Sequence, residues 1–485
     1  MLRISNLSLM SLARSIFTNT AIHAIGKVIS TAIGLAVVAM VARYLKPEGF
    51  GEYSTVAAYL QIFGIVLDMG LYVLAMREIS KPGTDIARTF SSFFTLRLFS
   101  AVLILLPAPL IVHLFPYSDN VKIGVIITTV SYFGLSVIQM LTMFFQYKMA
   151  MTRVVIAETL GRIILLISVL AGISLNAGLH GMLAAVTIGS LVNASTAFFF
   201  MTRQIAFRLN FDFTHWKYIL KETWPIGLSI FFNLIYYKMD TVILSLSWPS
   251  SVVGLYGAPY KVLEVLITFP AMFAGLMTPH FVKTYAEGNA ERFEKLLSRA
   301  LEVMTMIAVP LAIGTLFLGK DIMVLVGGQD FAESGNILKI LMFAAAAIFI
   351  GNLFSNTVVA IGKQKKMLWV YIAVAIISLG LYLYFIPKYS YWAASILTVV
   401  SETIVMCLGI YIVLSNTRAR INLKGILKII ISAGVMGLFL HLAKLPLILA
   451  IPAGAIIYGS MLILTKAITA QTLKEIFSTQ RKEPA

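Results

Sequence analysis

Cysteine is almost absent from this 485-residue chain, and charged residues are scarce. The single cysteine, Cys407, lies in an apolar stretch, so no disulfide can form within the chain and cysteine-based metal or redox chemistry is not expected. Only 12% of the residues are charged and 59% are hydrophobic, which leaves too little polar surface for a soluble domain. The chain also has no Gly-rich phosphate loop, no metal-ligand cluster and no paired loop carboxylates. We therefore expect neither an enzyme nor a bound metal or cofactor.

Long apolar runs are what the chain has in abundance. A helix needs roughly 20 apolar residues to cross the hydrocarbon core of a bilayer, and about fourteen segments reach that length. Their apolar character is continuous rather than alternating, which argues against a β-barrel. The sequence therefore predicts an all-α integral membrane protein with about 14 transmembrane helices. The predicted segments cover residues 19–43, 52–76, 92–114, 121–145, 154–174, 179–201, 223–247, 252–282, 299–319, 336–361, 367–386, 392–414, 426–443 and 445–466.

Lysine and arginine are distributed unevenly between the gaps that separate these segments. The formal net charge is +17, from 38 Lys and Arg residues against 21 Asp and Glu residues. Most of the basic residues fall in the even-numbered gaps and at the two ends of the chain, and cytoplasmic loops carry such an excess. This predicts a multi-pass protein of the cell (inner or cytoplasmic) membrane with both termini in the cytoplasm. The same rule accounts for the basic charge, so nucleic acid is not an expected partner.

Two stretches of the chain resemble each other. Gly51 and Tyr53, at the entry to the second segment, are followed 203 residues later by Gly254 and Tyr256, at the entry to the eighth. Chance recurrence of Gly-x-Tyr is the alternative, and the matching topological positions disfavour it. Two six-helix halves of the same orientation would be related by an axis along the membrane normal, with a transport site at their interface. The expected division is 1–201 for the first lobe, 202–222 for a cytoplasmic linker, 223–414 for the second lobe, and 415–485 for two extra helices and a cytoplasmic tail.

Several loose motifs occur in an order that resembles one known family. They are Arg43 to Tyr53, Asp68 to Leu71, Asp240 to Leu244, Val253 to Ala258, and Ile386 to Tyr389 followed by Ala393 and Ala394. Together they are similar to the polysaccharide-synthesis branch of the multidrug/oligosaccharidyl-lipid/polysaccharide exporter superfamily. Trp392 departs from a frequent Gly-Ala-Ala of that family. The resemblance covers roughly residues 15–415.

The resemblance implies a flippase that works by alternating access between two lobes. Its substrate would be a polyprenyl-(di)phosphate-linked oligosaccharide, moved from the cytoplasmic to the outer leaflet for biosynthesis of a surface polysaccharide such as O-antigen, lipopolysaccharide or exopolysaccharide. Candidate partners are this glycan substrate, membrane lipids, a coupling ion (H⁺ or Na⁺), a polysaccharide polymerase and glycosyltransferases. A peptidoglycan-precursor flippase and a multidrug exporter of the same superfamily are the alternatives.

Charged residues inside the apolar segments are the candidate functional residues. A charge in the bilayer core costs about 2.5–3.5 kcal/mol on insertion scales, so such residues usually face a cavity or a partner. A diphosphate needs cations, and the candidate substrate-binding residues are Lys27, Arg97, Lys238 and Lys261. The candidate coupling or gating residues are His23, Asp68, Asp240, Glu264 and Glu402.

Each of these assignments has a structural alternative. Lys27 could extend its long side chain to the membrane surface instead of a cavity. The spacing of Glu158 and Arg162, four residues apart, favours an ion pair along one helix, and Lys261 and Glu264 could neutralise each other in the same way.

Overall fold

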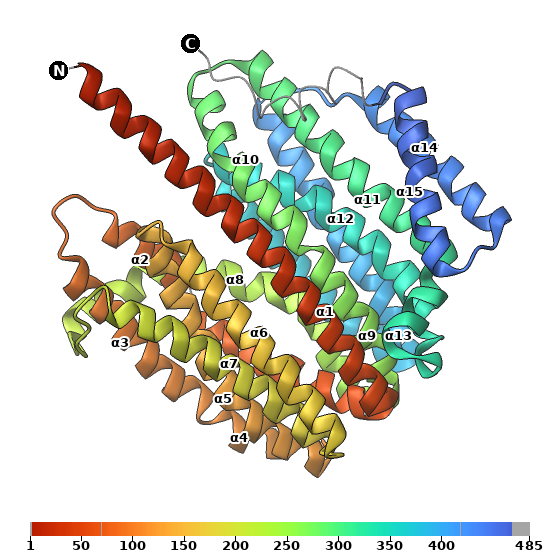
Figure 1. Cartoon of the computed structure of the whole chain (residues 1–485), viewed down its shortest axis with the longest axis horizontal. Coiled ribbons are helices and arrows are strands. Elements are labelled where there is room, and N and C mark those ends of the chain that lie inside the picture. Colours follow the sequence, from red (N-terminus) through yellow and green to blue (C-terminus); the bar gives the residue numbers. More distant parts are fainter. Residues whose placement is uncertain (1, 69, 418, 468–485) are drawn as a thin grey trace. The chain divides into compact units, whose positions relative to one another are not determined.

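The computed structural model describes residues 2–68, 70–417 and 419–467, and these form helices joined by short connections (Figure 1). The helices are α1 (Leu2–Asp68), α2 (Leu71–Ile79), α3 (Ile86–Leu105), α4 (Ala108–Ile111), η1 (Val112–Leu114), α5 (Asp119–Tyr147), α6 (Met151–Ser174), α7 (Gly178–Thr202), α8 (Phe213–Ser247), α9 (Ser250–Leu266), α10 (Thr268–Ala286), α11 (Ala290–Gly327), η2 (Gln329–Phe331), α12 (Ser334–Ala360), α13 (Gln364–Thr417), α14 (Leu423–Ala443) and α15 (Leu447–Leu464). No strand occurs among the described residues. The predicted all-α class is confirmed.

The predicted apolar segments lie on these helices. Within the described ranges, eleven helical segments are long and apolar enough to cross a membrane, and two of them, 29–64 and 364–417, each span a pair of predicted segments. The predicted seventh segment forms α8 but is not among the eleven. The predicted count of about 14 is thus roughly consistent with the structure.

The two longest helices are each interrupted at one residue. Lys46 in α1 has φ 59° and ψ 177°, and Ser390 in α13 has φ 56° and ψ −144°. Positive φ is unfavourable for residues with a Cβ atom, so a helix cannot continue through either position. In α1 the break is followed by Pro47, which has no amide N–H to donate. Each break falls between two predicted membrane segments, so α1 and α13 are pairs of helices.

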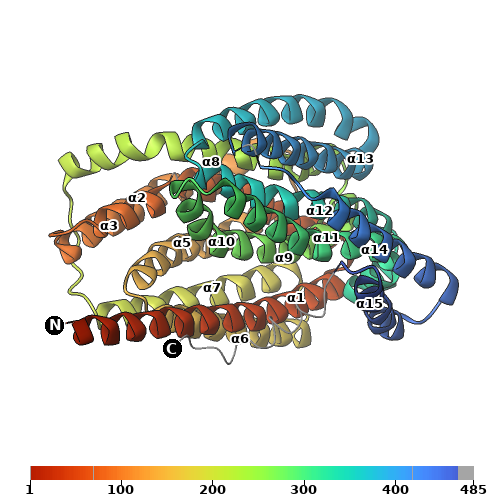
Figure 2. The same ribbon diagram turned by 90° about the horizontal axis from the view of Figure 1, so that it is seen from above.

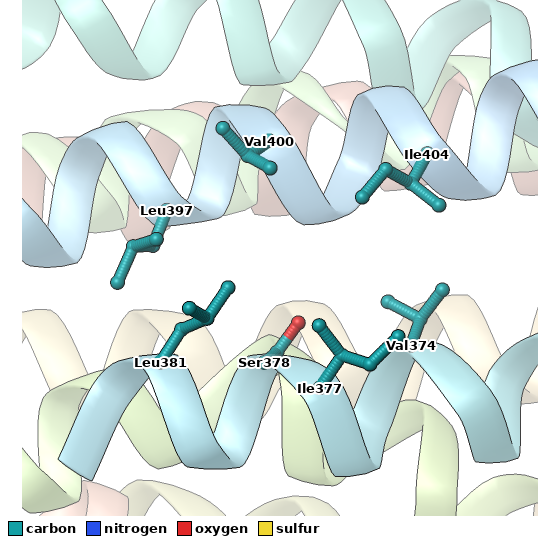
Figure 3. Close-up of a pocket in the computed structure, with 7 residues that line it drawn as sticks. All are labelled: Val374, Ile377, Ser378, Leu381, Leu397, Val400 and Ile404. Carbon is teal, nitrogen blue, oxygen red and sulfur yellow. The ribbon is translucent and has the colours of Figure 1, made fainter. Parts of the chain in front are cut away.

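Side-chain order shows that the two parts of α13 run antiparallel. Figure 3 places Leu381 opposite Leu397 and Val374 opposite Ile404, so the residue order is reversed across the crevice between them. The crevice has a volume of about 20 Å³, close to the space that one water molecule needs. Apart from Ser378, its lining side chains are apolar. It is therefore a packing gap and not a place for a charged headgroup.

The contacts within the chain separate two compact units, Met1–Gly257 and Ala258–Ala485. In the first unit α1 packs against α5 and α6, and α7 packs against both α5 and α6. Figures 1 and 2 show α5 and α7 running side by side. In the second unit α12 packs against α10, α11 and α13, and α14 packs against α11 and α15. The boundary lies within α9, beyond residues 202–222. The division into two six-helix lobes at 201 and 223 stays a prediction.

A close helix crossing joins the two sequence stretches that resemble each other. A Cβ atom at Gly51 would lie 1.6 Å from the Ser250 carbonyl oxygen, and one at Gly254 would lie 1.8 Å from the Pro47 carbonyl oxygen. The contacts are reciprocal, because Pro47 and Ser250 are separated by the same 203 residues as the two glycines. Only glycine permits this approach of one backbone to the other. Two elements related by a two-fold axis would meet in this way.

Candidate functional site

An ion pair between two helices lies at the centre of the candidate site. Lys27 of α1 donates from Nζ to Glu158 Oε1 of α6 over 3.1 Å, and the Ser30 hydroxyl donates to the same oxygen over 2.8 Å. The side chains of Lys27 and Glu158 are 35% and 20% exposed, so the pair is only partly shielded from its surroundings. The Glu158 carboxylate is thus held by two donors from α1.

Arg162 lies one helical turn beyond Glu158 on α6. Its guanidinium is close enough to act electrostatically on the Glu158 carboxylate, and its Nη1 lies 3.3 Å from the position of a Cβ atom at Gly34 of α1. No hydrogen bond or ion pair of the Arg162 side chain occurs within the part of the chain that the structure describes. The pair expected along α6 is therefore wrong. Glu158 pairs with Lys27 instead, and the Arg162 guanidinium forms no ion pair among the described residues.

These three charged side chains border one cavity of about 390 Å³ in the first unit, which we call the α1/α5/α6/α7 pocket. Its lining residues are Lys27, Ser131, Leu135, Ile138, Thr142, Val154, Glu158, Gly161, Arg162, Leu165, Val186, Gly189, Ser190 and Asn193. With two cations and one carboxylate, the described lining residues have an excess of one positive charge. Because the pocket lies among apolar helices, this charge would be costly without a ligand, water or counterion.

Two glycines determine how closely the walls of this pocket approach. A Cβ atom at Gly161 of α6 would lie 2.8 Å from the Gly189 carbonyl oxygen, and one at Gly189 of α7 would lie 2.9 Å from the Gly161 carbonyl oxygen. This crossing also places Asn193 against Gly161. The hydroxyl of Ser190 donates to the Ser131 carbonyl oxygen of α5 over 3.0 Å. Polar groups of α5 and α7 therefore face the charged groups of α1 and α6.

Arg97, a predicted substrate cation, is buried in the protein with 1% of its surface exposed. Its Nε donates to the Ser136 hydroxyl over 2.8 Å, its Nη1 donates to the Leu67 carbonyl oxygen over 2.6 Å, and its Nη2 donates to the Gln139 side chain. The guanidinium thereby connects α3 to α1 and α5. This geometry favours a structural role for Arg97 over contact with a substrate.

Lys238 and Asp240, the central charges of α8, are also buried. Lys238 is 5% exposed, and its Nζ lies 5.0 Å from the centre of the Tyr237 ring. Asp240 is fully buried and accepts hydrogen bonds from the Tyr256 hydroxyl and from the amide and hydroxyl of Thr241. The ammonium of Lys238 is close enough to interact electrostatically with Asp240. Asp240 therefore connects α8 to α9.

The remaining candidates of the second unit are held by neighbours. Lys261 donates to Glu264 over 2.8 Å, so the neutralisation that their spacing favours is present. Glu402 is 7% exposed and interacts electrostatically with the Tyr371 hydroxyl.

The side chains of His23 and Asp68 lie outside the described residues, so their proposed coupling roles stay predictions. No group of three or more His, Cys, Asp or Glu side chains suited to a metal ion occurs among the described residues.

Sequence reasoning did not select four polar residues of the pocket, nor Ser30, which does not line the pocket but donates to Glu158. Ser30, Ser131, Thr142, Ser190 and Asn193 are neutral, and single neutral polar residues are common in membrane helices. A signal for Ser30 existed, because it lies three residues after Lys27 and therefore on the same helical face. For the four residues of α5 and α7, no local sequence pattern indicates that these helices pack against α6 at the pocket.

The described residues form an all-helical, multi-pass membrane protein. The structure of the lipid II flippase MurJ in an inward closed conformation superimposes with a TM-score of 0.73, covering 94% of this chain and 99% of that chain at 16% identity. Residues 16–285, more than half of the chain, match the family described as "Polysaccharide biosynthesis protein", and residues 225–383 match the MatE family. The chain therefore belongs to the polysaccharide biosynthesis protein family, and the resemblance seen in its motifs is confirmed.

Two curated relatives have names that bear on function. The capsular polysaccharide biosynthesis protein CapF of Staphylococcus aureus is 23% identical over 202 residues, which is 42% of this chain and 51% of that protein. The alignment thus spans about half the length of CapF. A putative O-antigen transporter of Shigella flexneri is 24% identical over 410 residues, covering 79% of this chain and 94% of that protein. Both relatives are similar to this chain at low identity.

Proposed function

We propose that this protein is a flippase that moves polyprenyl-(di)phosphate-linked oligosaccharide from the cytoplasmic to the outer leaflet of the cell membrane, for biosynthesis of a surface polysaccharide. The observation that carries the proposal is the α1/α5/α6/α7 pocket, which presents an excess of positive charge among membrane-spanning helices of a polysaccharide biosynthesis family member. The names of the Shigella and Staphylococcus relatives support a role in moving or building surface glycan.

The chemistry of such a substrate explains why the helices carry cations. A diphosphate and a glycan are both strongly hydrated, and neither crosses hydrocarbon unaided. Cationic donors offset the lost hydration through charge-assisted hydrogen bonds, while the polyprenyl tail remains in the lipid. Rocking of the two lobes, residues 1–201 and 223–414, would expose the headgroup first to the cytoplasm and then to the outside.

Orientation and energy supply are part of the same proposal. The excess of Lys and Arg in the even-numbered gaps supports cytoplasmic termini in the inner membrane. Candidate groups for coupling to H⁺ or Na⁺ are His23, Asp68, Asp240, Glu264 and Glu402. A polysaccharide polymerase and glycosyltransferases are the proposed protein partners, because they would consume the product and supply the substrate.

Genetic replacement tests this function. In a bacterial strain that lacks its own flippase for one surface glycan, the wild-type chain should restore that glycan at the cell surface, measured by glycan electrophoresis and surface labelling. Lys27→Ala and Lys238→Ala, alone and together, should abolish export while membrane-inserted protein persists. The exposed Arg203→Gln variant at the end of α7 serves as the matched control and should export normally.

The outcomes separate this function from its alternatives. Normal export by the Lys27→Ala/Lys238→Ala double variant would contradict a cationic translocation path. Rescue of growth in a strain depleted of its peptidoglycan-precursor flippase, without surface glycan, would assign the protein to that precursor. Resistance to cationic drugs without either rescue would assign it to drug export.

A further inference from the structure

Arg162 is placed to receive an anionic ligand. Its guanidinium carries five N–H donors in a planar fork that matches phosphate oxygens, and it makes no ion pair or hydrogen bond within the described residues. It borders a cavity of about 390 Å³, which is much larger than the space for one water molecule. A partly buried guanidinium that makes no hydrogen bond among the described residues, beside an open volume, is the arrangement expected of a binding group.

The other walls of the pocket add neutral donors. Asn193 of α7 lies against Gly161, one residue before Arg162, and Thr142 borders the same cavity. The Ser190 hydroxyl also borders it but already donates to the Ser131 carbonyl oxygen. Amide and hydroxyl groups can donate to phosphate oxygens that the arginine leaves unfilled. Among the described lining residues, Glu158 contributes the sole carboxylate, and the Ser30 hydroxyl and Lys27 ammonium bind it from the α1 side. The carboxylate is therefore already occupied and turned toward α1.

We propose that the α1/α5/α6/α7 pocket is a diphosphate-binding site in which Arg162 is the principal cation and Glu158 is an internal anion that competes with the ligand for Lys27. The identity of the lipid in this proposal rests on the proposed function. The binding of a diphosphate rests on the residues of the pocket alone. When a diphosphate enters, Arg162 and Asn193 bind it, and Lys27 is shared between the ligand and Glu158. Glu158 weakens binding by repulsion and thereby permits release, which a transporter requires.

Direct binding measurements on the purified full-length protein in lipid nanodiscs test this site. The probes are inorganic pyrophosphate and farnesyl diphosphate, which share a diphosphate and differ in the prenyl tail. Arg162→Gln should weaken binding about tenfold or more, because it removes charge-assisted hydrogen bonds to phosphate. Glu158→Gln should strengthen binding several-fold, because it removes a like charge and frees Lys27. Arg203→Gln, which removes one positive charge outside the pocket, should leave both affinities unchanged.

The Glu158→Gln variant keeps the test decisive even if Arg162→Gln folds poorly, since a misfolded protein does not gain affinity. The site is refuted if Glu158→Gln weakens binding, if folded Arg162→Gln binds like the wild type, or if the wild type binds neither probe. Tighter binding of farnesyl diphosphate than of pyrophosphate would identify a lipid headgroup as the ligand, and equal binding would identify a free diphosphate. Glycan export in cells is scored separately, so failure of this site and failure of the flippase function remain distinguishable.

Discussion

Lys27 donates to Glu158 over 3.1 Å, although Arg162 lies one turn from Glu158 on the same helix. The carboxylate is thus committed to a residue 131 positions away in the sequence rather than to the one that helical spacing favours. This choice ties α1 to α6 and leaves a guanidinium bordering the pocket. Mutations can therefore test separately the stability that the Lys27–Glu158 pair contributes and the positive charge that Arg162 contributes to the pocket.

The Lys27–Glu158 pair should show energetic coupling. Lys27→Met leaves a carboxylate among apolar helices, and we expect a loss of about 1–2 kcal/mol, between the values for exposed and for fully buried pairs. Glu158→Gln in the same background should recover most of that loss. Thermal unfolding of detergent-solubilised wild type, both single variants and the double variant measures the coupling. Additive effects would show that the ion pair does not stabilise the fold.

Arg97 should be required for folding rather than for substrate affinity. Arg97→Gln removes the donors to Ser136, Leu67 and Gln139. Ser136 and Leu67 are buried, and each buried acceptor left unsatisfied costs about 1–3 kcal/mol. We expect a strongly lowered unfolding temperature, with Arg203→Gln unchanged. Export per unit of folded protein, measured at reduced growth temperature, should stay close to that of the wild type. A specific fall in that ratio would instead place Arg97 on the substrate path.

The crossing at Gly51 and Gly254 should not tolerate a single added methyl group. Gly51→Ala places Cβ 1.6 Å from the Ser250 carbonyl oxygen, so the two helices must separate. Overpacking of this kind costs about 1–3 kcal/mol or more, and we expect little correctly folded protein by size-exclusion chromatography. Gly275→Ala is the matched control, because no heavy atom lies within 4 Å of its added Cβ. Equal yields of both variants would contradict the close crossing.

Tyr256 should stabilise the junction of α8 and α9 through Asp240. Tyr256→Phe removes one donor to a fully buried carboxylate, which costs about 1–3 kcal/mol. Asp240→Asn should cost a similar amount, and the double variant should cost less than the sum because both residues belong to one network. Chemical unfolding in detergent gives the three values. A Tyr256→Phe variant as stable as the wild type would show that the hydrogen bond contributes nothing.

The apolar helices could be predicted from the sequence because they depend on local hydropathy. Apolar length identifies spans such as 336–361, which the structure shows as α12, and proline marks helix breaks such as that before Pro47. The side-chain partners could not be predicted in the same way. Whether Glu158 pairs with Arg162 or with Lys27 depends on how α1 approaches α6, and the sequence around either residue does not encode that approach.

Residue type thus indicated a charged residue that borders a cavity, Lys27, but not the partners of the buried charges. Placing Lys27 beside a cavity follows from the cost of burying its charge, and the structure shows it there. Assigning Arg97 to the substrate followed from the same rule, yet three neutral acceptors from α1 and α5 satisfy it instead. A buried arginine between helices and an arginine facing a pocket have the same hydropathy signature, so only the tertiary contacts distinguish them.

The reciprocal contact of Gly51 and Gly254 has an evolutionary consequence. A residue that packs against its own counterpart makes a self-complementary contact, the kind found across the axis of a symmetric homodimer. A half-length ancestor would have needed one such glycine, which both subunits would have used. After gene duplication and fusion, the two copies would have become separate targets for mutation while still filling one space. Neither could then gain a side chain, because each faces backbone atoms of the other stretch.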